Sequence, residues 1–389
     1  MRNRRILATI TASAVIAAIL VAPSIAAGNS KNDCTAVDGD YIVVLNKGVS
    51  LANDIKNVNG RDVSPKYTYN SVFNGYSAFL TADQVCHLQK RPTVSLVEAD
   101  SEFSIESDQP NPTWGLDRVD QNSLPLTKNY SYTSTGSTVG STVNVYVVDT
   151  GINSTSQDFN GRVLPGWSGI DGSTADCNGH GTHVSGTIGG TTYGVAKEVK
   201  LIPVRVFNCS GSTTNTVIIS GLDWIVNNHG TEKAVVNMSL GGGASSVLDT
   251  AVNSLIGDGV VVVVAAGNSK RDACNSSPAR VPGAITVAAS DSTDTFASYS
   301  NYGSCVDIIA PGSNIKSNWW TSSTATNTIS GTSMASPHVA GSVARYLSSS
   351  TPSTHTSVAT DLQAASTKNA IKRLKIGTFN YLLYIDPLK

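Results

Sequence analysis

The feature that most limits the possible folds is a series of β-branched apolar runs that alternate with helical patterns from Trp114 onward. Most runs lack period-two alternation, which is typical of parallel strands buried on both faces. The runs are residues 143–148, 199–207, 234–240, 260–265, 284–289 and 306–309, and the helical patterns are residues 180–188, 216–228, 247–256 and 334–347. This alternation predicts an α/β fold, a doubly wound, mostly parallel sheet with helices on both faces.

The region upstream has a different pattern. Residues 41–45, 76–80 and 94–97 are typical of strands, and residues 51–58 and 81–89 of helices, the second helix being capped by Thr81. We expect a small ferredoxin-like α+β unit, which would be marginally stable alone. Residues 101–112 are polar and include Pro110 and Pro112, which indicates an exposed linker that a protease can cut.

The N-terminus has the layout of an export signal. Three arginines among the first five residues precede an apolar run, residues 6–22, and then small residues. This predicts a secretory signal peptide over residues 1–27. An uncleaved membrane anchor is the alternative, and Ser24-Ile25-Ala26 favours cleavage. No later stretch is long and apolar enough to span a bilayer, so we expect a secreted, extracellular protein without membrane contact after cleavage.

Charge and cysteine content limit the partners and the compartment. The formal net charge is −1 and only 14% of residues are charged, so we expect no nucleic-acid partner. The six cysteines of an exported chain are expected to form disulfides, but the sequence alone does not fix their connectivity. Upstream, Cys34 and Cys86 could bridge each other or stay reduced in a segment that is later removed.

One candidate nucleophile lies where a glycine turn enters a helical pattern. Ser333 follows Gly331 and opens the helical pattern 334–347. The free N–H groups and the dipole at such a helix N-terminus favour developing negative charge. An N-capping serine is the alternative interpretation. The G-x-S-x-G elbow of lipases fits poorly, because Ala335 stands where the second glycine would be.

Three further residues complete a possible catalytic set. Asp149 ends an apolar strand before a glycine turn, and His180 stands between two glycines at the start of a helical pattern. With Ser333 they supply the carboxylate, imidazole and hydroxyl of an activated nucleophile. Asn268 follows another apolar strand, and its amide could stabilise an oxyanion. The alternatives are turn residues for Asp149 and Asn268, and a metal site formed by His180 with His183, although no H-E-x-x-H motif is present.

These motifs resemble those of a known family. Val148-Asp149-Thr150-Gly151, His180-Gly181-Thr182-His183 and Gly331-Thr332-Ser333-Met334-Ala335-Ser336-Pro337-His338 stand in this order. Their order and residues are similar to the subtilisin-type serine proteases, and residues 114–118 and 237–243 resemble the proteinase K-like branch, aqualysin most of all. The resemblance runs from Tyr41 to the end of the chain. It implies a triad of Asp149, His180 and Ser333, with Asn268 and the Ser333 N–H as oxyanion donors.

The resemblance also implies how substrate is bound. Ser239, Leu240 and Gly241 would form an edge that hydrogen-bonds a substrate backbone, with residues 210–213 as the opposite edge. Thr213 stands where aqualysin has glycine, so a side chain projects where a substrate backbone would approach that edge. The primary specificity pocket would be lined by Ala265, Ala266 and Gly267. Small apolar walls without an acidic residue predict apolar or aromatic side chains at P1, the residue on the acyl side of the cleaved bond.

Disulfides and structural calcium are implied in the same way. The expected disulfides are Cys177–Cys209 and Cys274–Cys305, each contributing about 3–4 kcal/mol on chain entropy. One calcium site would use Asp307 with the carbonyls of Pro282 and Ala284. A second would use Asp117, Asp120, Gln121 and Asn129, with Thr127 where relatives have a carboxylate. Oxygen ligands suit Ca²⁺; a solvated turn is the alternative for each aspartate.

The resemblance implies a precursor with three parts. Residues 1–27 would be the signal peptide, 28–106 an inhibitory propeptide that assists folding, and 107–389 the catalytic domain. We therefore predict a secreted, monomeric serine endopeptidase that cleaves itself from its propeptide and hydrolyses proteins and peptides broadly. A non-catalytic binding protein with the protease fold, or a metallohydrolase using His180 and His183, would be the competing functions.

Overall fold

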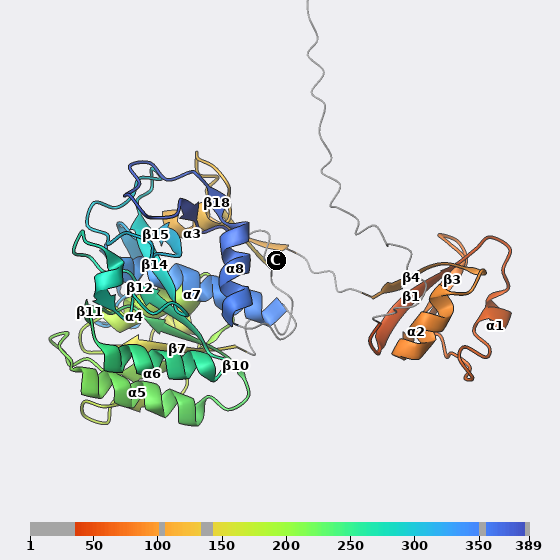
Figure 1. Cartoon of the computed structure of the whole chain (residues 1–389), viewed down its shortest axis with the longest axis horizontal. Coiled ribbons are helices and arrows are strands. Elements are labelled where there is room, and N and C mark those ends of the chain that lie inside the picture. Colours follow the sequence, from red (N-terminus) through yellow and green to blue (C-terminus); the bar gives the residue numbers. More distant parts are fainter. Residues whose placement is uncertain (1–35, 101–105, 134–142, 350–354, 386–389) are drawn as a thin grey trace, which may run out of the picture. The chain divides into compact units, whose positions relative to one another are not determined.

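The computed structural model describes residues 36–100, 106–133, 143–349 and 355–385. The chain divides into two compact units, Met1–Phe103 and Ser104–Lys389, which are described separately below (Figure 1). The predicted signal peptide and Cys34 lie outside the described residues. Within the described ranges, no helix has the length and apolar character needed to cross a membrane.

The first unit is a four-stranded antiparallel sheet in the order β2-β3-β1-β4. Its elements are β1 (Gly39–Leu45), α1 (Leu51–Asp54), β2 (Tyr67–Tyr69), β3 (Gly75–Leu80), α2 (Ala82–Gln89) and β4 (Val94–Ala99). The α+β prediction is confirmed, and Thr81 caps α2 by accepting the Gln84 N–H at 3.3 Å. Helix α1 is shorter than predicted, because the chain turns through positive φ angles at Asn57, Asn59 and Gly60.

The predicted linker is partly a strand. Residues 101–105 are outside the described ranges, but β5 (Glu106–Pro110) pairs antiparallel with β6 (Asn129–Thr133). Gln109 fixes β5 further, because its amide donates to the Thr192 carbonyl at 2.9 Å and accepts from Lys197 Nζ at 2.6 Å. The prediction of a loose linker is therefore wrong from residue 106 onward. The polar side chains of this segment are typical of a linker, but backbone pairing with β6 and the contact with the buried Lys197 hold it as a strand.

The second unit is built on a nine-stranded sheet in the order β18-β19-β15-β14-β12-β10-β7-β9-β8. All neighbours are parallel except β18 and β19. The strands are β7 (Val143–Asp149), β8 (Trp167–Ser168), β9 (Lys200–Arg205), β10 (Lys233–Met238), β12 (Val261–Ala265), β14 (Ile285–Ser290), β15 (Ile308–Pro311), β18 (Thr367–Lys368) and β19 (Tyr381–Leu382). The predicted mostly parallel sheet is confirmed.

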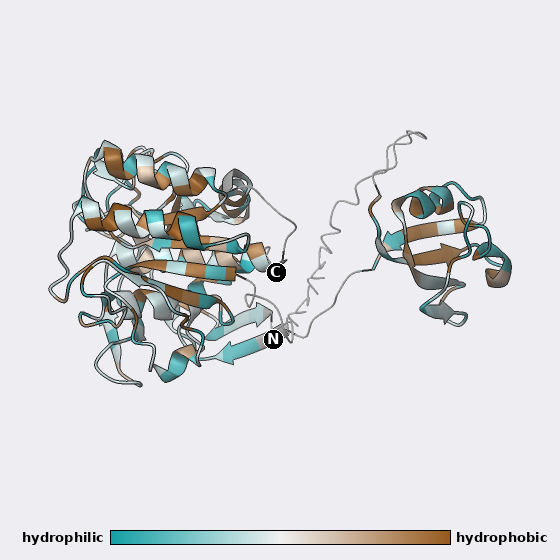
Figure 2. Ribbon diagram, turned by 90° about the horizontal axis from the view of Figure 1, so that it is seen from below, coloured by the Kyte–Doolittle hydropathy of each residue, from teal (hydrophilic) through white to brown (hydrophobic). Residues whose placement is uncertain are grey.

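Helices cover both faces of this sheet, as predicted. They are α3 (Trp114–Val119), α4 (His180–Gly189), α5 (Asn215–Asn228), α6 (Ser246–Gly257), α7 (Thr332–Ser349) and α8 (His355–Ala365). Along β7, Val145 and Val147 belong to the core that includes α4 and α7, whereas Tyr146 and Val148 belong to the core that includes α5 and α6. Figure 2 shows the apolar strands of this sheet in brown, beside helices that carry both apolar and polar residues.

The topology places one crevice at the carboxyl ends of the central strands. β7 lies between β9 and β10, so the chain leaves β7 to one side and later returns to the other. In open α/β sheets such a switch point opens a ligand-binding crevice. Asp149 ends β7, Ser239 follows β10, and Asn268 follows β12. These residues therefore meet at one edge of the sheet.

Candidate active site

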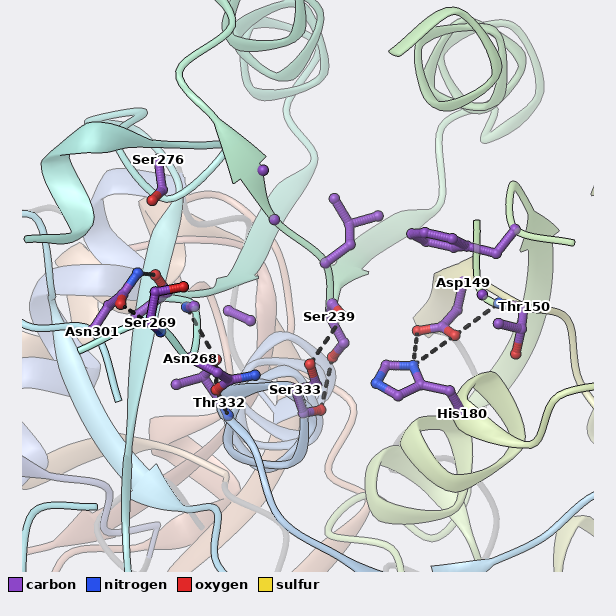
Figure 3. A pocket seen from close by; sticks show the side chains of 18 of the residues that line it. Asp149, Thr150, His180, Ser239, Asn268, Ser269, Ser276, Asn301, Thr332 and Ser333 are labelled. Carbon is purple, nitrogen blue, oxygen red and sulfur yellow. Dashed lines mark hydrogen bonds and ion pairs between the residues drawn. The ribbon is translucent and has the colours of Figure 1, made fainter. Parts of the chain in front are cut away.

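Asp149 and His180 form a tight pair at the end of β7. His180 Nδ1 lies 2.8 Å from Asp149 Oδ1 and 2.9 Å from Oδ2 (Figure 3). The Asp149 side chain is 1% exposed and that of His180 is 29% exposed, so the ring keeps access to the cleft. Burial lowers the pKa of His180, but the charge of Asp149 and the hydrogen bond to it raise the pKa above its ordinary value overall.

The loop before His180 is organised by Asp176, a buried residue that sequence reasoning missed. Asp176 Oδ1 accepts the N–H groups of Asn178 and Gly179, both at 2.9 Å. Its Oδ2 accepts the N–H and the hydroxyl of Thr182, at 2.9 and 2.6 Å. An aspartate just before a glycine turn that opens a helix is a signal for such a capping role. This carboxylate fixes the backbone that carries His180.

Ser333 lies in the first turn of α7 on the same cleft. Its hydroxyl donates to the Ser239 carbonyl at 3.1 Å, and it makes no hydrogen bond with His180 in this structure. The Ser333 carbonyl accepts the Ser239 hydroxyl at 2.9 Å. That carbonyl lacks its helical partner because Pro337, four residues later, has no N–H. Two hydrogen bonds therefore join the start of α7 to the segment after β10.

The amide of Asn268 is oriented by the residue before Ser333. Asn268 Oδ1 accepts the N–H and the hydroxyl of Thr332, at 2.9 and 3.0 Å. Since the oxygen is engaged there, the amide nitrogen is directed toward Ser333, as Figure 3 shows. The Thr332 hydroxyl also accepts the Gly267 N–H at 3.0 Å. Thr332 was not singled out from the sequence, because its role depends on a contact across the cleft.

The predicted substrate-binding residues line one cleft of about 360 Å³, which Asp149, His180, Asn268 and Ser333 also line. They are Ser239, Leu240, Gly241, Ala265, Ala266 and Gly267. Gly267 has φ +101°, and a Cβ there would lie 2.5 Å from Asn301 Nδ2, so only glycine fits. Residues 210–213 form no strand, and the Thr213 hydroxyl donates to the Val206 carbonyl at 2.5 Å.

Comparison with known proteins identifies the family. The sequence profile of the subtilase family matches residues 140–381, and that of the peptidase inhibitor I9 family matches residues 40–106. The chain belongs to the subtilase family. It is a subtilase serine peptidase with an I9 inhibitor propeptide.

Named relatives of this subtilase carry protease names. It is 54% identical to an extracellular serine proteinase of Thermus sp. (strain Rt41A), over 81% of this chain and 76% of that protein. It is 45% identical to the alkaline serine exoprotease A of Vibrio alginolyticus, over 80% of this chain and 58% of that protein. The crystal structure of a cold adapted subtilisin-like serine proteinase matches with a TM-score of 0.67 and 49% identity, covering 71% of this chain and 98% of that one.

Disulfides fix the loops around the cleft of this subtilase. The structure pairs Cys177 with Cys209 and Cys274 with Cys305, the pairs that the resemblance implied. Cys86 is also disulfide-bonded. The first bond joins the loop before His180 to the loop after β9, and the Asn178 amide donates to the Cys209 carbonyl at 3.1 Å. The loop that carries His180 and the 208–213 loop therefore form one cross-linked unit.

The histidines of the alternative metal site point to different partners. His183 is fully buried in α4, and its Nε2 lies 2.9 Å from the Ile315 carbonyl, whereas His180 faces Asp149. Burial lowers the pKa of His183 to about 4, so the ring is neutral. Among the described residues, no group of three or more His, Cys, Asp or Glu side chains could hold a metal ion. The geometry gives no support to a metallohydrolase.

Several oxygens of the second implied calcium set accept local hydrogen bonds. Asp117 Oδ1 accepts the N–H and the hydroxyl of Thr127, at 3.1 and 3.0 Å, and Oδ2 accepts the Lys128 N–H at 2.8 Å. Asp120 Oδ2 accepts the Ser131 N–H at 2.7 Å, and Gln121 Oε1 accepts the Thr127 N–H at 2.9 Å. Backbone donors thus meet part of the charge of these carboxylates, and calcium binding by this set stays a prediction.

Asp307 has the character that a cation site requires. Its Oδ2 accepts the Thr286 N–H at 2.8 Å, which holds it beside the start of β14, close in sequence to Pro282 and Ala284. No lysine, arginine or histidine of the described ranges forms an ion pair with it. Burial raises the pKa of Asp307 to about 6, although the Thr286 hydrogen bond acts against this. Its Oδ1 accepts a long hydrogen bond from the neutral Gln363 amide at 3.4 Å, so the carboxylate has neutral donors but no cationic partner, which fits a bound Ca²⁺.

Proposed function

We propose that this subtilase is a secreted serine endopeptidase of broad specificity, with Asp149, His180 and Ser333 as its triad and Asn268 as an oxyanion donor. The observation that carries the proposal is the doubly contacted Asp149–His180 pair on the same cleft as Ser333 and a pre-oriented Asn268 amide. Such an arrangement supplies a nucleophile, a base with a fixed tautomer and a preorganised oxyanion donor.

In the first half-reaction, Ser333 Oγ leaves the Ser239 carbonyl and attacks the scissile carbonyl carbon. Its proton passes to Nε2 of His180, and Asp149 stabilises the imidazolium through Nδ1–H. The negative charge that develops on the substrate oxygen is bound by Asn268 Nδ2 and the Ser333 N–H. The intermediate collapses as the C–N bond breaks, and His180 returns the proton to the leaving amine.

In the second half-reaction, water attacks the acyl-enzyme and His180 accepts its proton. Collapse of the second intermediate returns that proton to Ser333 and releases the carboxylate product. Meanwhile the backbone of the peptide would pair with Ser239, Leu240 and Gly241 as an added strand. The P1 side chain would lie against Ala265, Ala266 and Gly267, whose small apolar surfaces favour apolar or aromatic groups.

The precursor would mature in three parts. We assign residues 1–27 to the signal peptide, 28–106 to the propeptide and 107–389 to the catalytic domain, and the division of the chain near Phe103 supports the second boundary. The propeptide would act as intramolecular inhibitor and folding assistant. The extracellular Thermus relative supports secretion, and the motifs at 114–118 and 237–243 favour the proteinase K-like branch, near aqualysin.

A fluorophosphonate tests the proposed function directly. The reagent phosphonylates only an activated serine, so we expect stoichiometric labelling of the mature protein, mapped by peptide mass analysis to Ser333, with parallel loss of casein hydrolysis. Labelling should be absent after heat denaturation, which serves as the control. An active protein that resists the reagent but loses activity with a zinc chelator would contradict the proposal, and so would a folded protein with neither labelling nor hydrolysis.

Replacing Asn268 by alanine should lower kcat by about 10²–10³-fold, with a much smaller effect on KM. The amide is expected to donate chiefly to the oxyanion, so its loss removes stabilisation that exists mainly in the transition state. Steady-state kinetics with a chromogenic peptide will measure this. Asn227→Ala is the control, because Asn227 lies on the exposed face of α5. Asn301→Ala would not serve, because the Asn301 side chain donates to the Ala266 carbonyl in the wall of the cleft. Equal falls in 1/KM and kcat/KM would contradict the role.

We further propose that Ca²⁺ binds at Asp307 with the carbonyls of Pro282 and Ala284, as a structural ion. Without a cation, the pKa of Asp307 is higher in the folded than in the unfolded protein. The contribution of Asp307 to the free energy of unfolding is therefore fully present below about pH 4 and is lost as pH rises through about 6. Asp307→Asn should therefore raise the unfolding temperature in chelator at pH 8 by several degrees, a change on the order of 2 kcal/mol.

Added Ca²⁺ should reverse the order of the two proteins. It should raise the unfolding temperature of the parent protein and leave that of Asp307→Asn unchanged. Calorimetry will measure both temperatures on phosphonylated enzyme, because phosphonylation prevents autolysis. Asp249→Asn, on an aspartate already paired with Arg280, is the control that should keep the Ca²⁺ response. A full Ca²⁺ response in Asp307→Asn would place the ion elsewhere.

A further inference from the structure

One buried hydroxyl in the cleft has no use in the proposed mechanism. Ser276 is 4% exposed and lines the cleft, yet its Oγ is buried without a hydrogen-bond partner among the described residues. An unpaired hydroxyl in this position destabilises the folded protein. A ligand group that hydrogen-bonds Ser276 Oγ would remove this cost.

The position of Ser276 is set by a short pair of strands. β13 (Ser276–Ser277) pairs with β11 (Gly242–Gly243), so Ser276 lies opposite Gly243, two residues after the end of the predicted substrate edge at Gly241. Figure 3 shows Ser276 with Asn301 and Ser269 at the end of the cleft away from Ser333 and His180. The same cleft is lined by Ala265 and Ala266, so it has both apolar and polar walls.

The neighbouring amide of Asn301 is held by other groups and makes no hydrogen bond to Ser276. Asn301 Nδ2 donates to the Ala266 carbonyl at 2.8 Å, and its Oδ1 accepts the Ser269 and Arg271 N–H groups at 3.0 and 3.2 Å. The next residue offers a contrast. Ser277 Oγ accepts the Ser245 N–H at 2.8 Å, so a serine in this strand finds a backbone partner when its side chain points the other way.

We propose that Ser276 is a specificity-determining residue, which hydrogen-bonds the tip of the P1 side chain and makes the pocket select tyrosine over phenylalanine. The inference rests on the proposed function, since it refines the apolar or aromatic P1 preference. A tyrosine hydroxyl can donate to Ser276 Oγ or accept from it, whereas phenylalanine has the same shape and leaves the serine unpaired. The pairing should favour tyrosine by about fivefold in kcat/KM.

The experiment compares two peptides that differ only in tyrosine or phenylalanine at P1. We expect a kcat/KM ratio of about 5 for the parent enzyme and about 1 for Ser276→Ala. Ser290→Ala is the matched control, because Ser290 is also buried with an unpartnered hydroxyl but lies in β14 and does not line the cleft. Ser290→Ala should keep the parent ratio.

Two results would overturn the inference. One is a parent ratio of 1 or less, which needs no variant and is decisive even if Ser276→Ala fails to fold. The other is a parent ratio that Ser276→Ala retains. Failure of the proposed function itself looks different, because neither peptide would then be cleaved, or Ser333→Ala would cleave both as fast as the parent. Hydrolysis of both peptides without the predicted ratio therefore counts against Ser276 alone.

Discussion

Ser333→Ala is expected to lower kcat by about 10⁶-fold and to leave the propeptide attached. Without Oγ there is no nucleophile for His180 to activate, and only the oxyanion donors and substrate binding still contribute to catalysis. The intact mass of the secreted product will test the second part. The parent protein should begin near Ser107, whereas the variant should retain the segment from residue 28.

Ser342→Ala provides the control on the same helix. Its hydroxyl is buried and donates to the His338 carbonyl, away from the cleft, so this variant should be processed and active like the parent. If Ser333→Ala and the parent protein are shortened alike, another protease removes the propeptide, and self-cleavage is refuted. Full hydrolytic activity in Ser333→Ala would refute the nucleophile as well.

Asp149→Asn is expected to lower kcat by about 10⁴-fold without loss of the fold. The new amide can donate to His180 Nδ1, which puts the imidazole proton on Nε2, where a proton acceptor is needed. The side chain keeps its size in a site that is 1% exposed, so the unfolding transition should change little. Kinetics normalised by active-site labelling and circular dichroism will separate these two expectations.

The pH profile gives a second measure of the same variant. Asp149 raises the pKa of His180, so its removal should lower that pKa and move the acidic limb of kcat/KM to lower pH. Asp258→Asn is the matched control, since Asp258 also pairs with a histidine, His229, at 2.6 Å but does not line the cleft. An unchanged kcat in Asp149→Asn would refute the triad, as would an equal loss in Asp258→Asn.

The elements with a strong local signal were predictable. The apolar run of β7 ends in Asp149-Thr150-Gly151, so both the strand and the carboxylate at its end could be recognised. Thr81 and Gln84 likewise show the start of α2. β5 could not be found in this way, because its polar residues gain their order from β6 and Lys197, which are distant in sequence. Residues 1–35 lie outside the described part of the chain.

Long-range contacts also limited what could be foreseen of the site. The triad candidates stand in recognisable motifs, but the roles of Asp176, Thr332 and Ser276 depend on which groups face them after folding. Asp117 illustrates the converse case. Its oxygen-bearing neighbours predict a calcium set, which stays a prediction, but they do not reveal that the loop also donates N–H groups to the Asp117 carboxylate. Composition indicates possible ligands and does not count local donors.

The proline in the second turn of α7 has a consequence for how a peptide would be presented to the enzyme. A regular helix would close its own first turn and leave Ser333 independent of the neighbouring chain. Because Pro337 leaves one carbonyl open, Ser239 closes that turn from outside. The backbone edge along which a peptide would lie and the Ser333 Oγ that would attack it are thus joined directly by hydrogen bonds. The distance between them depends on the N–H that Pro337 lacks, and a helix with a residue other than proline there would lose this link.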